Sequence, residues 1–139
     1  PSLTELLYTV GAGKQIVGVI AGSDYPKSAL MIKKIGDYRD LDLESILSLH
    51  PDLILAWQGG NPISQLDKLQ KLGIPVYYSD ITHLTQIPNF LRKLGCLTGH
   101  QKTAAKKAAA FNHTYQSYRK ENTSKIKTRV FLNYGLNLY

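Results

Sequence analysis

Two apolar runs that hardly alternate with polar residues constrain the fold of this chain more than any other feature. Residues 15–21 (QIVGVIA) and 52–57 (DLILAW) have the length of strands and are rich in aliphatic side chains. A shorter run, PVYYS at 75–79, has the same character. Strands that are apolar on both sides are typical of a parallel sheet, because helices cover both of its faces. The runs therefore predict an α/β fold with a parallel sheet flanked by helices.

Helical patterns separate these runs and support the same fold class. Ser2 and Glu5 match a capping box, followed by a helix that Gly11 or Gly13 ends. Asp42 is placed to cap a second helix, and Pro62 to start a third. Further helices are predicted within 82–99 and over 100–121, and RVFLNY at 129–134 predicts a last strand. Strands that alternate with helices through short loops favour parallel pairing.

The order of elements divides the chain into three expected parts. Residues 1–98 are expected to form an N-terminal α/β ligand-binding lobe, 99–127 an interlobe spine helix, and 128–139 the first strand of a truncated C-terminal lobe. Both chain ends resemble cuts inside a larger protein. An apolar edge at 129–139 invites pairing with another chain, so we expect the isolated fragment to dimerise there.

Composition excludes several functional classes. The formal net charge of +7 arises from 17 Lys and Arg against 10 Asp and Glu, but many of the cations cluster around the last helix and its exit loop, and no aromatic-interleaved basic motif of nucleic-acid-binding proteins is recognised. A solvated helical face explains them, and no nucleic-acid partner is expected. Cys96 is the single cysteine and the four histidines are scattered, so neither a disulfide nor a metal site is predicted. No stretch approaches the roughly 18 apolar residues of a membrane span.

Ligands of open parallel sheets bind outside the carboxyl ends of the strands. This rule selects the loops at 22–26, 57–61 and 79–83 and the turn before the first helix, whose candidate residues are Ser2, Tyr25, Trp57, Gln58, Asn61 and Asp80. The set contains no nucleophile elbow, no paired carboxylates at recurring spacing and no phosphate-cradling glycine loop. We therefore expect a binding wall and not an enzyme active site.

Trp57 is the strongest candidate for that wall. It is the only tryptophan, and a strand delivers it to the turn that contains Gly59 and Gly60. A tryptophan offers a wide, rigid apolar surface, and glycines beside it let a bulky ligand approach the backbone. From residue type alone, a core residue that closes the end of the sheet is an equally valid interpretation.

Three segments carry a resemblance to a known family. SDYP (23–26), LDLESILSLHPDLILAWQGGN (41–61) and QLDKLQKLGIPVYYSD (65–80) closely resemble the periplasmic cobalamin-binding proteins of bacterial vitamin B12 importers. RVFLNYG (129–135) resembles the first strand of that family's second lobe. The resemblance implies a non-enzymatic receptor, with two lobes joined by a rigid helical backbone. Such a receptor captures cobalamin in the periplasm and delivers it to the permease of an ABC transporter.

The resemblance also implies roles for individual residues. Trp57 matches an aromatic residue that lines the corrin pocket, and Tyr38 falls where the family has another aromatic on the same wall. Gly22 stands where the best-known members have a ligand-contacting tyrosine, and Tyr25 either replaces part of that surface or packs its own turn. Glu44 matches a surface glutamate that docks on arginines of the permease. Glu44 is also expected in the first turn of a helix, where its negative charge stabilises the helix by interacting with the macrodipole. Both roles can hold at once.

Two alternatives remain open at this point. A haem or siderophore receptor of the same superfamily shares the LE-x-I-x-x-L-x-PDL pattern at 43–53, although a siderophore pocket would need several basic side chains. A flavodoxin-like enzyme domain would need a phosphate site at a strand-to-helix turn, and WQGGNP has no lysine and a proline without an amide hydrogen. No cofactor is expected, and cobalamin is expected to be absent from the isolated chain or weakly bound.

Overall fold

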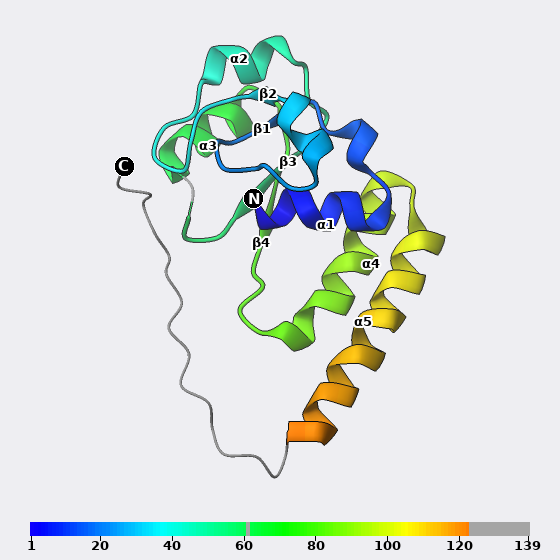
Figure 1. The fold of residues 1–139 in the computed structure, drawn as a ribbon. Helices are drawn as coiled ribbons and strands as arrows, with labels where there is room; N and C mark the ends of the chain where they lie inside the picture. Colours follow the sequence, from blue (N-terminus) through cyan, green and yellow to red (C-terminus); the bar gives the residue numbers. More distant parts are fainter. Residues whose placement is uncertain (61, 123–139) are drawn as a thin grey trace, which may run out of the picture.

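The computed structural model of the chain describes residues 1–60 and 62–122 (Figure 1). Its helices are α1 (Ser2–Val10), α2 (Leu43–Ser48), α3 (Ile63–Lys71), α4 (Ile87–Thr98) and α5 (Gln101–Asn122). Its strands are β1 (Gly18–Val19), β2 (Lys33–Lys34), β3 (Ile54–Trp57) and β4 (Val76–Ser79). Short 3₁₀ helices occupy Gly13–Gln15, Lys27–Met31 and Leu84–Gln86. The predicted α/β class with parallel strands and a long final helix is confirmed.

The strands of the described region form two parallel pairs, β1 with β2 and β3 with β4. In the second pair Ile54 lies opposite Val76 and Trp57 opposite Ser79. The strand predicted at 15–21 is shorter than expected because the backbone N–H of Ile16 closes a 3₁₀ turn onto Gly13 and takes the start of the run out of extended geometry. β2 was not predicted, since two lysines carry no strand pattern.

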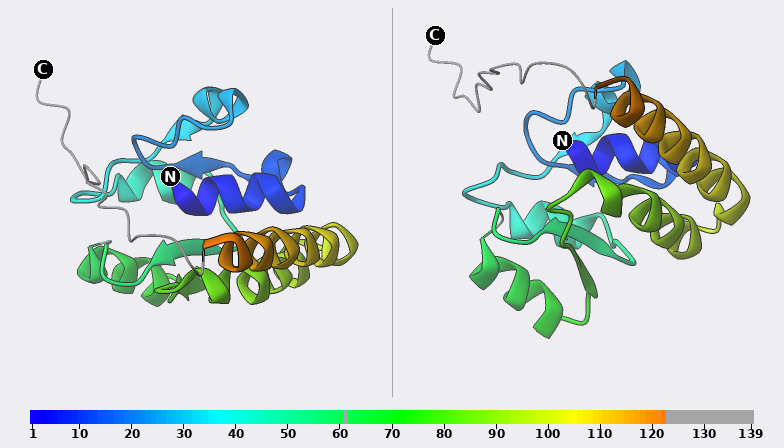
Figure 2. Two further views of the ribbon diagram at one scale, coloured as in Figure 1. Left: turned by 60° about the horizontal axis from the view of Figure 1, so that its bottom comes forward. Right: turned by 90° about the horizontal axis from the view of Figure 1, so that it is seen from below.

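Helices cover both sides of the β3–β4 pair, as predicted. One cluster lies between the strands and α1, α4 and α5, and its buried residues are Val10, Ala12, Phe90, Leu91, Leu94, Ala104 and Ala108. The opposite cluster lies on the side of α2 and α3, with buried residues Leu41, Ile46, Ala56, Leu66 and Leu69. Leu55 and Tyr77 pack on the first cluster and Tyr78 on the second, which is the alternation that a strand imposes. Figure 2 shows α1 beside the α4–α5 pair.

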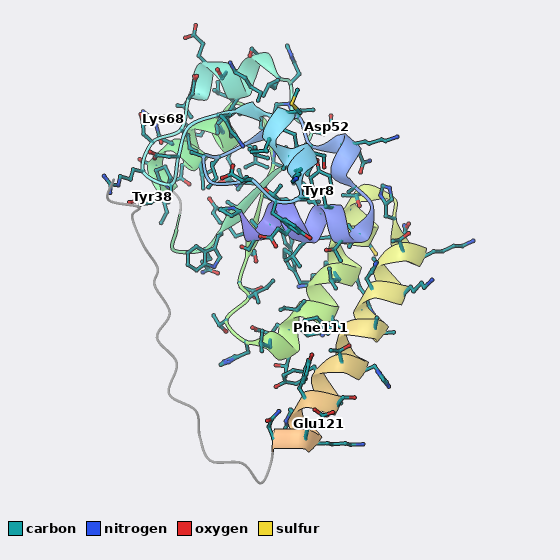
Figure 3. All side chains as sticks on the ribbon, viewed as in Figure 1. Tyr8, Tyr38, Asp52, Lys68, Phe111 and Glu121 are labelled. Carbon is teal, nitrogen blue, oxygen red and sulfur yellow. The ribbon has the colours of Figure 1, made fainter. Side chains whose placement is uncertain are left out.

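Glycine makes the close approach of α4 and α5 possible. A Cβ built on Gly95 would lie 2.3 Å from the Cβ of Ala104, so no larger residue fits there. The α4–α5 connection turns through Gly99, whose φ is +75°. Only Ala104 and Ala108 are buried along α5. Phe111 lies near the middle of the helix (Figure 3), and its ring stacks with that of Tyr115. Within residues 1–60 and 62–122, no helix combines the length and the hydropathy of a membrane span.

Local signals at the helix ends are partly confirmed. The Asp42 carboxylate caps α2 by accepting hydrogen bonds from the Ser45 backbone N–H at 2.9 Å and the Ser45 hydroxyl at 2.6 Å. Gly11 ends α1 with a φ of +94°, as expected. The capping box at Ser2 is wrong, because Ser2 is already the first helical residue and Pro1 stands at the N-cap without a side-chain hydrogen bond. Several predictions lie outside the described residues. They are the end of the expected spine at 123–127, the strand at 129–134, the third part at 128–139 and the dimer contact at 129–139.

Candidate functional site

Trp57 lies at the carboxyl end of β3, where the sheet rule places a ligand. Ladder pairing continues one residue past the strand, since the N–H of Gln58 donates to the Ser79 carbonyl at 3.0 Å. The chain then turns, and the N–H of Gly60 donates back to the Trp57 carbonyl at 3.2 Å. The tryptophan side chain is 48% exposed. A residue that closes the core would be buried, so the core interpretation of Trp57 is wrong.

The two glycines of this turn have different roles. Gly59 has a φ of +87°, which strains any residue with a side chain, and a Cβ built there would meet nothing within 4 Å. A Cβ on Gly60 would lie 2.2 Å from Cε3 of the Trp57 indole. The interpretation that both glycines leave room for a ligand is therefore wrong for Gly60. Because Gly60 has no side chain, the indole of Trp57 can occupy the space next to its Cα.

An open pocket of about 270 Å³ lies beside the indole. It is lined by Trp57, Gln58, Gly59, Ile63 and Tyr78. Ile63, on the first turn of α3, and Tyr78, one residue before the end of β4, were not among the sequence candidates. Ile63 is 62% exposed, which is unusual for an isoleucine that merely packs a helix onto a core. Its place directly after the Trp57 turn is the signal by which the sequence could have shown it.

Tyr38 projects from a tight turn next to α3 and does not line the Trp57 pocket. The Asp37 carboxylate organises this turn by accepting hydrogen bonds from the N–H groups of Arg39 at 2.7 Å and Asp40 at 3.0 Å. These backbone hydrogen bonds lower the pKa of Asp37. The Arg39 guanidinium donates to the Tyr38 hydroxyl at 2.7 Å and stands 5.0 Å from the centre of its ring. Tyr38 is thereby held 53% exposed at the edge of the molecule (Figure 3).

The loop after β1 contributes a separate exposed patch. Gly22 has a φ of +80°, a Cβ built there would lie 3.8 Å from Cγ of Pro1, and Tyr25 is 70% exposed. That exposure contradicts packing of Tyr25 on its own turn. Lys34 on β2 fixes the loop by donating to the Ser23 carbonyl at 3.1 Å and pairing with Asp24 at 3.7 Å. Neither Gly22 nor Tyr25 lines the pocket at Trp57.

The remaining candidates are dispersed. Asp80 lines a second pocket of about 220 Å³ between the end of β4 and α4. Ser2 is the exposed first residue of α1, and Asn61 lies outside the described residues. Glu44 is exposed in the first turn of α2, which is the position both of its expected roles require. Across residues 1–60 and 62–122, no group of three or more His, Cys, Asp or Glu side chains is arranged to hold a metal ion.

Comparison with known proteins defines the class of this fold and site. All of residues 1–139 match the periplasmic binding protein family, and the chain belongs to that family. The solved periplasmic vitamin B12 binding protein of Vibrio cholerae superposes with a TM-score of 0.82 at 35% identity, over 87% of this chain and 48% of that one. The periplasmic haem-binding protein of Roseiflexus superposes with a TM-score of 0.75 at 27% identity, over 85% of this chain and 46% of its own.

Sequence relatives point to a particular branch of the family. The vitamin B12-binding proteins of Yersinia pestis (strain Pestoides F) and Yersinia pseudotuberculosis (serotype O:1b) are each 43% identical over 135 residues. The match takes in 97% of this chain and 48% of each relative, so the chain spans about half the length of the curated relatives it matches.

Proposed function

We propose that this chain supplies one wall of the ligand site in a receptor that binds cobalamin in the periplasm and delivers it to an ABC importer. The observation that carries the proposal is the 43% identity with vitamin B12-binding proteins along 97% of the chain. In such a receptor, residues 1–98 form the ligand-binding lobe and residues 99–127 the spine that leads to a second lobe. The protein acts by binding and release, without a chemical step.

The geometry around Trp57 supports this function. The indole, Tyr78 and Ile63 offer apolar and aromatic surface at the carboxyl end of the sheet. A pocket of about 270 Å³ is smaller than the roughly 300–1,000 Å³ that enclose a whole drug-sized ligand. The wall therefore suits one face of a large, flat molecule, and the rest of the enclosure comes from another part of the receptor. If the ligand covers the exposed half of the indole, about 100 Å², burial contributes roughly 2–3 kcal/mol.

A titration tests the ligand. Trp57 is the only tryptophan of residues 1–139, so in the 139-residue chain every change in indole fluorescence reports on this wall. We expect saturable binding of cyanocobalamin by calorimetry and by fluorescence corrected for absorption, with weaker binding by the 139-residue chain than by a longer protein that contains it. Trp57→Ala should reduce affinity roughly 30- to 100-fold and leave the far-ultraviolet circular dichroism spectrum, which reports secondary structure, unchanged. Absence of saturable binding to the longer protein at micromolar ligand would disprove the proposal.

Haem is the competing ligand, because haem-binding proteins share the fold. A parallel titration with haemin separates the two receptors. Preference for haemin over cyanocobalamin by tenfold or more would reassign the protein within its family. A flavodoxin-like enzyme domain would bind phosphate through backbone N–H groups at the turn before α3. Pro62 stands at the N-cap of α3 and has no N–H, which argues against that alternative.

We further propose that Glu44 docks the receptor on basic residues of the permease. The residue is exposed in the first turn of α2 and forms no ion pair within the described part of the chain. Charges at the rim of an interface act mainly on encounter and orientation. Glu44→Lys should leave cyanocobalamin affinity unchanged and reduce uptake in cells. Asp52→Lys, the same charge change at an exposed residue outside α2, is the control, and equal uptake by both variants would remove the docking role.

A further inference from the structure

The side chain of Gln65 joins α3 to the turn that carries Tyr38. Its Oε1 accepts a hydrogen bond from the backbone N–H of Leu41 at 2.9 Å. Its Nε2 donates to the Leu41 carbonyl at 3.2 Å and to the Asp40 carboxylate at 2.8 Å. One amide thus contacts the turn through three hydrogen bonds. The two segments are 24 residues apart in the sequence, so this is a tertiary contact and not part of a local turn.

The contact satisfies backbone groups that have little access to water. Leu41 is 6% exposed, and both its N–H and its carbonyl bind the Gln65 amide. Buried backbone groups without partners are costly, so the turn has a strong preference for the position in which Gln65 can reach it. A primary amide suits this site because it offers a donor and an acceptor at once. Neither an aliphatic side chain nor a carboxylate makes all three hydrogen bonds.

The same helix also shapes the pocket at Trp57. α3 begins directly after the Trp57 turn, and Ile63 on its first turn lines the pocket. Gln65 stands two residues further along. α3 therefore contacts the Trp57 wall through Ile63 and the Tyr38 turn through Gln65. A rigid element between two contact surfaces fixes their separation before a ligand arrives, which reduces the entropy lost on binding.

We propose that Gln65 is a positioning residue that fixes the Tyr38 turn relative to the Trp57 pocket, so that both aromatic surfaces are in place for one ligand. The consequence for cobalamin rests on the proposed function, whereas the placement of the turn does not. Gln65 touches the turn and acts on the ligand only through Tyr38.

Amide hydrogen exchange tests the placement without any ligand. Gln65→Met removes all three hydrogen bonds at similar volume, and we expect the Leu41 amide to exchange at least tenfold faster. The Asp42 amide, which donates to the Ile35 carbonyl at 3.0 Å, should change less than twofold. Gln65→Glu replaces the donor by an oxygen that faces the Asp40 carboxylate and the Leu41 carbonyl, so at neutral pH it should also fail to protect the Leu41 amide. Gln70→Met is the matched control, an exposed glutamine on the same helix. An unchanged Leu41 exchange rate in Gln65→Met would overturn the proposal.

A double-mutant cycle tests the action through Tyr38. Gln65→Met should weaken cyanocobalamin binding about fivefold in the otherwise unchanged protein, and less than twofold when Tyr38 is already alanine. Equal losses in both backgrounds would show that Gln65 acts on α3 itself and would overturn the proposed route. If the unchanged protein binds no cyanocobalamin while Leu41 exchange still responds as expected, the cobalamin function fails and the placement of the turn stands.

Discussion

Gly60→Ala is the change that most sharply tests how the Trp57 wall is built. The added Cβ would lie 2.2 Å from Cε3 and 2.7 Å from Cζ3 of the indole, where ordinary contact begins at 3.4 Å. The ring must therefore retreat by about 1 Å or adopt another rotamer. Because the side chain is half exposed, it can swing outward into solvent and spare the core.

The expected cost falls on binding more than on stability. An indole moved off its rotamer minimum costs about 0.5–1.5 kcal/mol of unfolding free energy. If the displaced ring loses its contact with the ligand, roughly 100 Å² of burial is lost, about 2.5 kcal/mol or some 60-fold in affinity. A partial displacement should lie between 10- and 60-fold. The tryptophan emission maximum should also move to longer wavelength in the free protein, since the ring becomes more exposed.

Gly59→Ala provides the control with the opposite pattern. Its φ of +87° makes a side chain unfavourable by about 1–2 kcal/mol, yet an added Cβ touches nothing within 4 Å. We expect lower stability in urea, an unchanged emission spectrum and an affinity within threefold of the parent. Calorimetry with cyanocobalamin and urea unfolding of both variants complete the comparison. If Gly60→Ala binds as tightly as the parent, or both variants lose affinity equally, the assignment of Gly60 to the indole is refuted.

Three further predictions concern the scaffold. Gly95→Ala places a methyl group 2.3 Å from the Cβ of Ala104 and should lower the unfolding free energy by at least about 1–3 kcal/mol in urea; an unchanged midpoint would show that α4 and α5 can separate freely. Leu66→Ala, at a site only 1% exposed, should cost about 2–5 kcal/mol in the same assay, and a loss under 1 kcal/mol would contradict its place in the core. The hydrogen bonds from Ser45, that of its hydroxyl above all, lower the pKa of Asp42 in the folded protein. The stabilisation that they give is therefore fully present above the ordinary pKa of about 3.9, and it is lost as the pH falls through the lower pKa of the folded state. The melting temperatures of Asp42→Ala and the parent should accordingly differ at neutral pH and converge in strong acid, and a constant difference across that range would refute the assignment.

Local chemistry made much of this fold predictable from the sequence. The strands at Ile54–Trp57 and Val76–Ser79 can be predicted from the sequence because their side chains are apolar on both faces. The Asp42 cap and the end of α1 at Gly11 depend on single residues and their near neighbours, so short patterns identify them. The place of Trp57 at the carboxyl end of a parallel strand was predictable in the same way, whereas its 48% exposure was not, since a buried aromatic residue fitted the residue type equally well.

Features that depend on distant partners could not be predicted in this way. β2 consists of Lys33 and Lys34, which form a strand only because β1 pairs with them. The role of Gly60 depends on the rotamer of the indole three residues earlier, and that of Gln65 on a turn 24 residues away. Sequence patterns identify which residues are unusual, whereas their contacts arise only when the helices and strands pack.

The shape of α5 has a mechanical consequence. Its 22 residues extend about 33 Å, but its buried anchors, Ala104 and Ala108, lie in the first half, close to the bend from α4. The helix is thus held most firmly near its first turns, while its second half is mostly exposed. A tilt of about 5° at the base displaces the far end by roughly 3 Å at this length. The contact between Gly95 and Ala104, made by the two smallest side-chain types, therefore sets the angle between α4 and α5.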